Sequence, residues 1–246
     1  MNLDDLQTTW DALGRDDPLW AILSDADKKG RRWEAKEFFA TGVREVGALM
    51  ADVRSLNDAL GCRAALDFGC GVGRLTQPLA EHFAEVVGVD VSPSMIRLAQ
   101  QHNRQPDRCR YFVNASPDLA RFPTGHFDFV LSYLTLQHIP PRYTKRYLRE
   151  FVRVVTTGGM ICFQLPSAPA AVWAALRVPV WRAKGAVRAL LARIGVGKGA
   201  KMAMYGIGSA TVDRFLHEAG GRLVDVSRVD DCTPGWKGYR YVATKE

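Results

Sequence analysis

The chain of 246 residues lacks several features that would place it in other classes of protein. Its five cysteines are odd in number and form no C-x-x-C pair, which argues against a disulfide framework and a structural zinc site. Residues 1–5 lack the basic region and apolar core of a signal peptide, and no apolar run reaches membrane-spanning length. We therefore expect a soluble, cytoplasmic protein with reduced thiols and no bound metal.

Acidic residues are absent from residues 167–207, which carry seven Lys and Arg. The net charge of +7 belongs to this segment, because the remaining 26 basic residues balance the 26 Asp and Glu. A helix over 180–194 would place its apolar side chains in one sector and its cations outside it. Such a basic amphipathic helix acts either as a lid over an active site or as a contact for an anionic lipid surface or an acidic substrate. A uniformly basic nucleic-acid-binding face is not expected.

Predicted strands and helices alternate along most of the chain. Residues 1–60 have helical periodicity and form a predicted N-terminal cap, in which Trp33 and Phe39 either line a pocket or pack against the sheet. Residues 61–246 form the predicted main domain, with strands at 64–68, 86–90, 109–113, 127–132, 160–165, 222–229 and 239–244 and helices at 74–83, 93–102, 142–155 and 211–219. This order predicts an α/β fold with helices on both faces of a sheet and a ligand site at the carboxyl ends of its strands.

The most informative stretch is residues 64–76. An apolar run containing Asp67 leads into three glycines at alternate positions, Gly69, Gly71 and Gly73, and then into a predicted helix. Glycine lets the backbone turn tightly and approach a bound molecule. The dinucleotide fingerprint G-x-G-x-x-G would require a glycine where Arg74 stands, so a nicotinamide cofactor is disfavoured.

This stretch resembles motif I of the class I S-adenosylmethionine-dependent methyltransferases. The next strand ends in Asp90 and is followed by Ser92 and Met95, similar to the D-x-S-x-x-M of that family, and the likeness covers about residues 60–166. The resemblance implies a Rossmann-like, seven-stranded sheet in the order 3-2-1-4-5-7-6 with the last strand antiparallel. It also implies a turn at 157–159 before the fifth strand and, for this chain, a helical N-terminal extension and a helical insert after that strand.

The resemblance also implies which residues bind the cofactor, S-adenosylmethionine. Asp67 would orient the amino end of its methionine part, Asp90 would accept hydrogen bonds from the ribose hydroxyls, and Met95 would flank the adenine. The complete expected set is Asp67, Gly69, Gly71, Gly73, Asp90, Met95, Asn114, Ala115 and Ser132. Asn114 departs from the family pattern, which usually has an acid at this place.

The predicted catalytic residue is His138, which follows the fourth core strand at the carboxyl edge of the sheet. Methyl transfer from a sulfonium requires an acceptor atom held in line and, for a hydroxyl acceptor, a base for its proton. Imidazole titrates near neutrality and is suited to this role, although the same residues can instead shape the loop. Tyr133 and Tyr205 are weaker candidates for acceptor binding.

Several methyltransferase subclasses do not fit the residues after the fourth strand. Ser132–Thr135 lack the Pro-Pro-aromatic pattern of amino methyltransferases, and no nucleophilic cysteine lies there for cytosine-C5 chemistry. Residues 131–141 contain no acid for a divalent ion. We therefore predict metal-independent methylation of a small organic acceptor, with oxygen weakly favoured. A lipid, quinone or lipid-linked glycan acceptor and a non-catalytic cofactor-binding subunit stay open, and the sequence does not define the oligomeric state.

Overall fold

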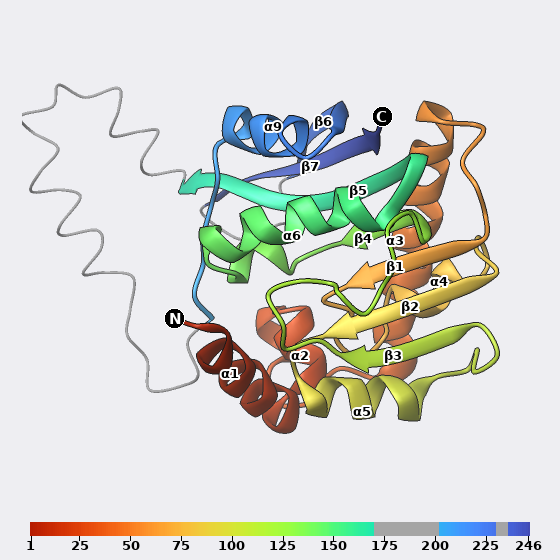
Figure 1. Ribbon diagram of the computed structural model, residues 1–246. Coiled ribbons are helices and arrows are strands. Elements are labelled where there is room, and N and C mark those ends of the chain that lie inside the picture. Colours follow the sequence, from red (N-terminus) through yellow and green to blue (C-terminus); the bar gives the residue numbers. More distant parts are fainter. Residues whose placement is uncertain (170–201, 230–235) are drawn as a thin grey trace, which may run out of the picture.

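The computed structural model describes residues 1–169, 202–229 and 236–246, and these residues form one seven-stranded sheet in the order β3-β2-β1-β4-β5-β7-β6 (Figure 1). The predicted strand order is confirmed, and β7 runs antiparallel to both of its neighbours. The strands are β1 (Ala64–Phe68), β2 (Glu85–Asp90), β3 (Cys109–Val113), β4 (Phe127–Ser132), β5 (Val155–Pro169), β6 (Gly221–Val229) and β7 (Trp236–Lys245).

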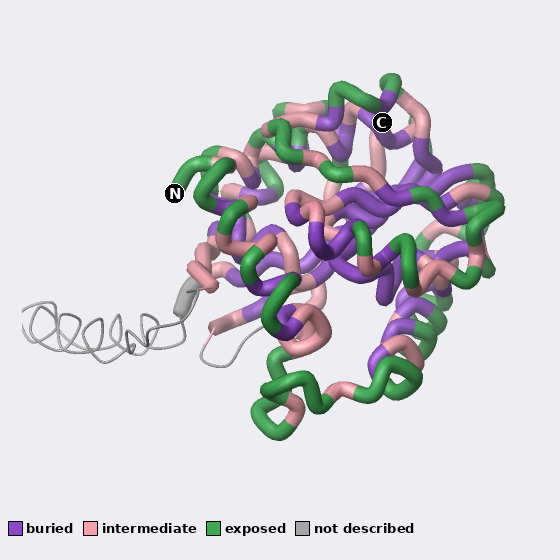
Figure 2. Tube along the Cα trace, turned by 90° about the horizontal axis from the view of Figure 1, so that it is seen from below, coloured by how far each residue is buried: buried purple, intermediate pink, exposed green. Residues whose placement is uncertain are grey.

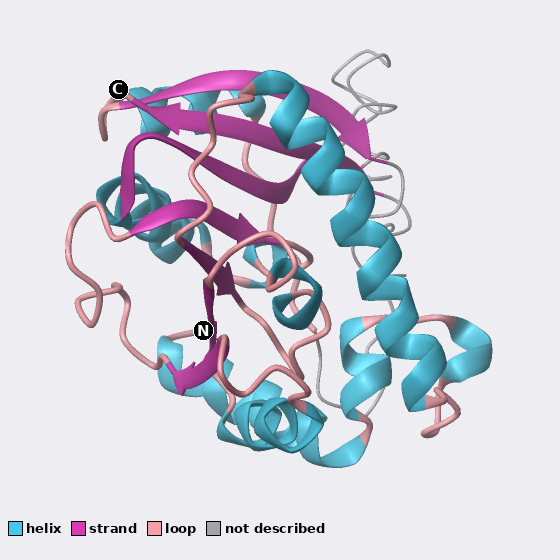
Figure 3. Cartoon of the chain, turned by 90° about the vertical axis from the view of Figure 1, so that its right-hand side faces the viewer, coloured by secondary structure: helices cyan, strands magenta, loops and turns pink. Residues whose placement is uncertain are grey.

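Helices cover both faces of the sheet. Helices α6 and α9 lie on one face, and the long α3 runs along the other (Figures 1 and 3). The helical elements are α1 (Leu3–Asp16), α2 (Pro18–Ile22), η1 (Ala26–Lys28), α3 (Ala35–Leu56), α4 (Thr76–Leu79), α5 (Pro93–His102), η2 (Leu136–His138), α6 (Pro141–Val154) and α9 (Ser209–His217). The predicted basic helix over 180–194 lies outside the described residues.

The alternation of side chains along the strands creates two cores. In β1, Leu66 and Phe68 pack toward α6 and α9, whereas Ala65 packs toward Val46 and Met50 of α3. The central strands β1 and β4 are therefore buried on both faces, whereas β3 and β6 at the edges of the sheet are partly exposed and the helices are buried along one side (Figure 2). Among the described residues, no helix is long and apolar enough to cross a membrane.

Two expectations about local structure need correction. The helix expected over 74–83 is only α4, Thr76–Leu79, because the N–H groups of Ala80, Glu81 and His82 bond to carbonyls three residues back instead of four. The turn expected at 157–159 is a bulge inside β5, where the chain from Val155 to Met160 lies opposite Phe127 to Phe129 of β4.

Candidate functional site

A cavity of about 680 Å³ lies at the carboxyl ends of β1, β2 and β4. Figure 1 shows α1 and α2 beside these strand ends. One end of the cavity is formed by the turn after β1 and by Asp90, and the other end is largely apolar. The lining residues are Leu3, Leu6, Trp10, Ala21–Asp25, Phe68, Gly69, Gly71, Val89–Val91, Met95, Asn114, Tyr133–Thr135, Gln137–Ile139, Tyr147, Met202 and Met204. Such a volume is typical of pockets for cofactors and small molecules.

The glycines of the turn have different neighbours. Gly71 lines the cavity with φ +54°, and a Cβ there would lie 2.5 Å from Cδ1 of Ile22 in α2. Gly73 has φ +84°, and a Cβ there would lie 2.6 Å from the hydroxyl of Tyr111, away from the cavity. Only glycine meets both the left-handed conformation and the close approach. Gly71 thus lets α2 cover the turn, whereas Gly73 lets a side chain of the sheet pack beneath it.

Asp90, the expected ribose ligand, lines the cavity at the end of β2. Its Oδ2 accepts a hydrogen bond from the Gly71 N–H at 3.0 Å and its Oδ1 accepts one from the Ser92 N–H at 2.8 Å. Each oxygen of a carboxylate has a second lone pair, which leaves two acceptor positions for a ribose diol. Burial raises the pKa of Asp90 to about 6, and the bonds from Ser92 and Gly71 oppose that rise.

Asp67 does not line the cavity. Its side chain is 2% exposed and accepts a hydrogen bond from Thr76 Oγ1 at 2.6 Å. Burial raises its pKa to about 6, although the bond from Thr76 opposes this. The carboxylate joins the end of β1 to the start of α4 and supports the turn, and its contact with the methionine part of the cofactor stays a prediction. The other predicted site residues outside the cavity lining are Gly73, Ala115 and Ser132, whose hydroxyl donates to Phe68 O at 3.1 Å.

Met95 and Asn114 do line the cavity, on the side where the resemblance implies the adenine. The Asn114 amide Nδ2 donates to the carbonyls of Ser116 and Asp118, both at 3.2 Å. This fixes the amide orientation and leaves Oδ1 as the atom suited to accept from an exocyclic amino group.

His138 lies in η2, is 9% exposed and lines the cavity. Its Nδ1 is 2.9 Å from Ala203 O, so this nitrogen carries the proton, and Nε2, which lies 3.2 Å from Gln137 Nε2, is the acceptor. Burial lowers the pKa of His138 to about 4. The expected titration near neutrality is therefore wrong, and the ring is neutral at pH 7.

The apolar end of the cavity is built largely by elements remote in sequence. Leu3, Leu6 and Trp10 come from α1, and Met202 and Met204 come from the loop that leads into α9. The helical spacing of the α1 residues was visible in the sequence, but it did not indicate what they face. Trp33 and Phe39 pack against a small apolar cluster that includes Leu13 and Phe38, and neither lines this cavity.

Two further loop residues adjoin the predicted catalytic position. Tyr133 lines the cavity, with its hydroxyl 3.6 Å from the buried Cys162 Sγ, whereas Tyr205 does not line it and donates its N–H to Gln137 O at 2.7 Å. Leu134 lines the cavity with φ +55°, a left-handed conformation that is strained for a bulky residue. Strain of this kind is typical of functional loops.

Comparisons with known proteins agree with the fold. Residues 66–163 match the family model described as methyltransferase domain. The ubiquinone biosynthesis O-methyltransferase of Xanthomonas oryzae is 33% identical over 105 residues, and the magnesium-protoporphyrin O-methyltransferase of Rhodobacter capsulatus is 36% identical over 114 residues. These alignments cover 42% and 46% of this chain and 43% and 48% of those relatives, so the chain spans less than half of their length.

Among solved structures, magnesium protoporphyrin IX methyltransferase from Synechocystis, with bound S-adenosylhomocysteine, superposes with a TM-score of 0.67 at 18% identity and covers 99% of both chains. A putative sarcosine dimethylglycine methyltransferase from Galdieria sulphuraria gives a TM-score of 0.61 at 14% identity, covering 83% of this chain and 86% of that one. At these identities the likeness concerns the fold.

Proposed function

We propose that the protein transfers a methyl group from S-adenosylmethionine to a hydroxyl group of a small, largely apolar organic acceptor, because residues 66–163 match the methyltransferase-domain model and the fold resembles that of a solved methyltransferase. One observation carries the proposal: Asp90 and His138 line the same cavity, Asp90 beside the glycine turn and His138 beside apolar side chains. The acidic end suits a ribose, and the apolar end suits a hydrophobic acceptor.

The residues present fit this cofactor. The Asp90 carboxylate has acceptor positions for two hydroxyls, Gly69 and Gly71 bring backbone to the cavity wall, and Met95 offers an apolar surface for a flat base. When bound, the cofactor supplies an electrophilic methyl group on a sulfonium. Residues of α1 and α2 line part of the cavity, and the walls that they provide favour an in-line approach of the acceptor oxygen.

His138 would hold the acceptor hydroxyl. Its Nε2 is the unprotonated nitrogen, and its single lone pair accepts from Gln137 Nε2 at 3.2 Å. Once the Gln137 amide has turned away, the acceptor hydroxyl would donate to Nε2 and pass its proton there as the new carbon–oxygen bond forms. Since burial keeps its pKa at about 4, His138 is a weak base. Its contribution comes from orienting the hydroxyl and taking the proton late, when the oxygen has become acidic.

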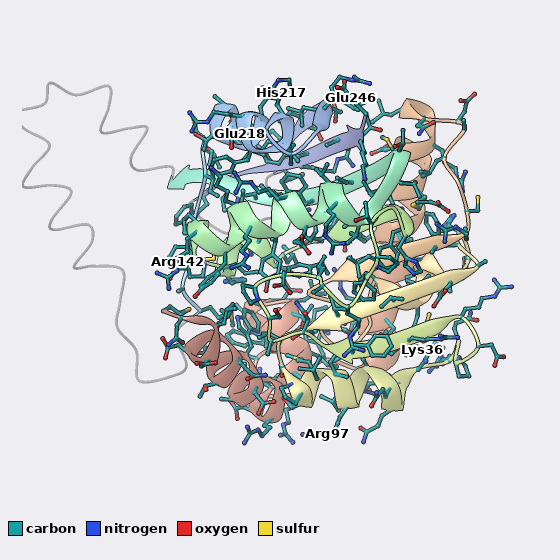
Figure 4. The ribbon with its side chains drawn as sticks, in the orientation of Figure 1. Lys36, Arg97, Arg142, His217, Glu218 and Glu246 are labelled. Atoms are coloured by element: carbon teal, nitrogen blue, oxygen red, sulfur yellow. The ribbon has the colours of Figure 1, made fainter. Side chains whose placement is uncertain are left out.

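The test is a paired measurement of binding and turnover. Calorimetric titration with S-adenosylhomocysteine measures cofactor binding, and a radiolabelled methyl-transfer screen over phenols and alcohols measures activity. We expect His138→Ala to keep cofactor binding within about twofold and to lower transfer about a hundredfold. His217→Ala is the matched control, because His217 is exposed on α9 at the periphery (Figure 4).

Two results would contradict the proposal. If neither S-adenosylmethionine nor its product binds, the motif is architectural. If both bind but no acceptor is methylated and His138→Ala leaves a partner enzyme's activity intact, the protein is a cofactor-binding subunit.

We also propose contact with anionic membranes through residues 167–207, on the support of their charge alone. Seven cations without an acid are attracted to anionic lipid, and this attraction weakens with salt. Co-sedimentation with phosphatidylserine vesicles at low salt, lost when Arg182, Lys184, Arg188 and Arg193 are neutralised, would support the proposal. An absence of sedimentation at low salt would refute it.

A further inference from the structure

Helix α1 is fastened to the loop after β2 by one stripe of its residues. Gln7 Nε2 donates to Val91 O at 3.0 Å, and Asp11 Oδ1 accepts from the Ser94 N–H at 2.8 Å. Gly14 completes the stripe, because a Cβ there would lie 2.4 Å from Ser94 Oγ. Positions 7, 11 and 14 follow one another at helical spacing and therefore share a face.

The hydrogen bonds of Asp11 continue without a break to the cofactor end of the cavity. Ser92 Oγ donates to Asp11 Oδ1 at 3.3 Å, while the N–H of Ser92 donates to Asp90 Oδ1 at 2.8 Å. Asp90 Oδ2 in turn accepts from Gly71 N–H at 3.0 Å. Asp11 is thus linked through one residue to the predicted ribose ligand and through it to the glycine turn.

A neighbouring stripe of α1 faces the acceptor end of the cavity. Leu3, Leu6 and Trp10 line it, and the Trp10 ring meets the His138 ring edge-on with centroids 5.0 Å apart. A helix moves as one body, so the contacts at positions 7, 11 and 14 also set where this apolar wall stands.

We propose that Asp11 is a positioning residue, which orients Asp90 for the cofactor and, through α1, places the wall of the acceptor end. The inference rests on the proposed function of the cavity. It makes cofactor binding and docking of α1 mutually reinforcing, because by linkage each must strengthen the other by the same factor.

The charge of Asp11 keeps its hydrogen bonds to the loop after β2 intact near neutral pH. Burial alone would raise the pKa of Asp11, but hydrogen bonds from Arg15 and Ser94 outweigh burial and lower it to about 2. The carboxylate is therefore ionised whenever the protein is folded near pH 7, and its bonds to the loop are charge-assisted.

The test compares the full chain with Asp11→Ala, Asp11→Asn and Asp4→Asn. Calorimetric titration with S-adenosylhomocysteine should show affinity about tenfold weaker for Asp11→Ala. Asp11→Asn keeps an oxygen that can accept from the Ser94 N–H, so its affinity should stay within about threefold of the wild type. Asp4 is exposed on the same helix, and its substitution should leave the affinity unchanged.

Hydrogen–deuterium exchange measures whether cofactor binding stabilises α1. If Asp11 only stabilised the fold, its substitution would not abolish this effect of the ligand. S-adenosylhomocysteine should slow exchange over residues 3–16 in the wild type, and this protection should be lost in Asp11→Ala while β1 and β4 stay protected.

The outcomes separate the two proposals. A wild type that does not bind S-adenosylhomocysteine overturns the proposed function and the role of Asp11 with it. If Asp11→Ala binds S-adenosylhomocysteine with wild-type affinity, only the role of Asp11 is overturned. The same holds if the ligand does not change hydrogen–deuterium exchange over residues 3–16 of the wild type. Faster exchange across the whole sheet in Asp11→Ala would mark a general loss of stability and would also overturn it.

Discussion

Replacement of Gly71 by alanine measures how tightly α2 is packed over the glycine turn. The residue has φ +54°, and the left-handed conformation costs a residue with a side chain about 1 kcal/mol. The added Cβ would also lie 2.5 Å from Ile22 Cδ1, more than 1 Å inside the usual carbon–carbon contact distance, and overpacking of this kind costs about 2 kcal/mol. Gly71→Ala should therefore lower the free energy of unfolding by about 3 kcal/mol.

Gly220→Ala is the matched control, because Gly220 has φ +83° and nothing within 4 Å of a Cβ. It should lose only the conformational part, about 1 kcal/mol. For a domain of this size, 1 kcal/mol corresponds to about 3 °C in Tm, so the two variants should differ by about 6 °C in a thermal denaturation followed by circular dichroism.

The double variant Gly71→Ala with Ile22→Ala isolates the clash. Removing the Ile22 methyl groups should make Gly71→Ala no more costly than Gly220→Ala, with a coupling energy of about 2 kcal/mol in the double-mutant cycle. Equal Tm values for Gly71→Ala and Gly220→Ala, or no coupling to Ile22, would refute the reasoning.

Three other perturbations follow from the charges of the structure. Because the pKa of Asp90 is raised to about 6, S-adenosylhomocysteine should bind about tenfold more weakly at pH 5 than at pH 7, while calorimetry on Asp90→Asn should show no such dependence. The pKa of Asp67 is about 6 in the folded protein and near 3.9 in the unfolded chain, so the folded state binds the proton more tightly. The free energy of unfolding measured by urea denaturation should therefore fall as pH rises from about 4 to about 6. It should depend less on pH in Asp67→Asn, which has no carboxyl group at this position. Glu45→Ala should cost about 3 kcal/mol in urea denaturation, because it leaves the 3% exposed Arg74 side chain without its ion-pair partner at 2.6 Å, whereas truncating the exposed Glu34 should cost less than 0.5 kcal/mol.

The sheet was predictable because its signals are local. The apolar runs that form β1, β3 and β4 have the bounds expected from the sequence, and the turn chemistry around Gly71 indicated where a ligand would bind. The helix after the turn was predicted too long, since periodicity continued past Pro78 while the backbone bonding changed. The local pattern of apolar residues indicates that a helix is present, but it does not indicate at which residue the helical hydrogen bonds stop.

The residues that line the cavity were predictable only where they stand at the end of a strand. Asp90 ends β2 and reaches the cavity, whereas Asp67 is turned away from it, toward Thr76. The contacts of Asp11 join residues 83 positions apart, and no pattern in α1 alone could reveal them. Burial lowers the pKa of His138, and part of the surface that covers its ring comes from a distant segment, Trp10 of α1, while the hydrogen bond to the Ala203 carbonyl opposes the shift.

The attachment of α1 to the loop after β2 also makes the cap part of the long-range architecture of the chain. The bond between Gln7 and Val91 joins residues 84 positions apart, the same separation as that between Met160 and Thr244, which pair across β5 and β7. Closing a chain segment of this length costs conformational entropy before the contact can stabilise the structure. The cap therefore raises the contact order of the fold, and with it the barrier to folding, in the same way as the pairing of the last strand does.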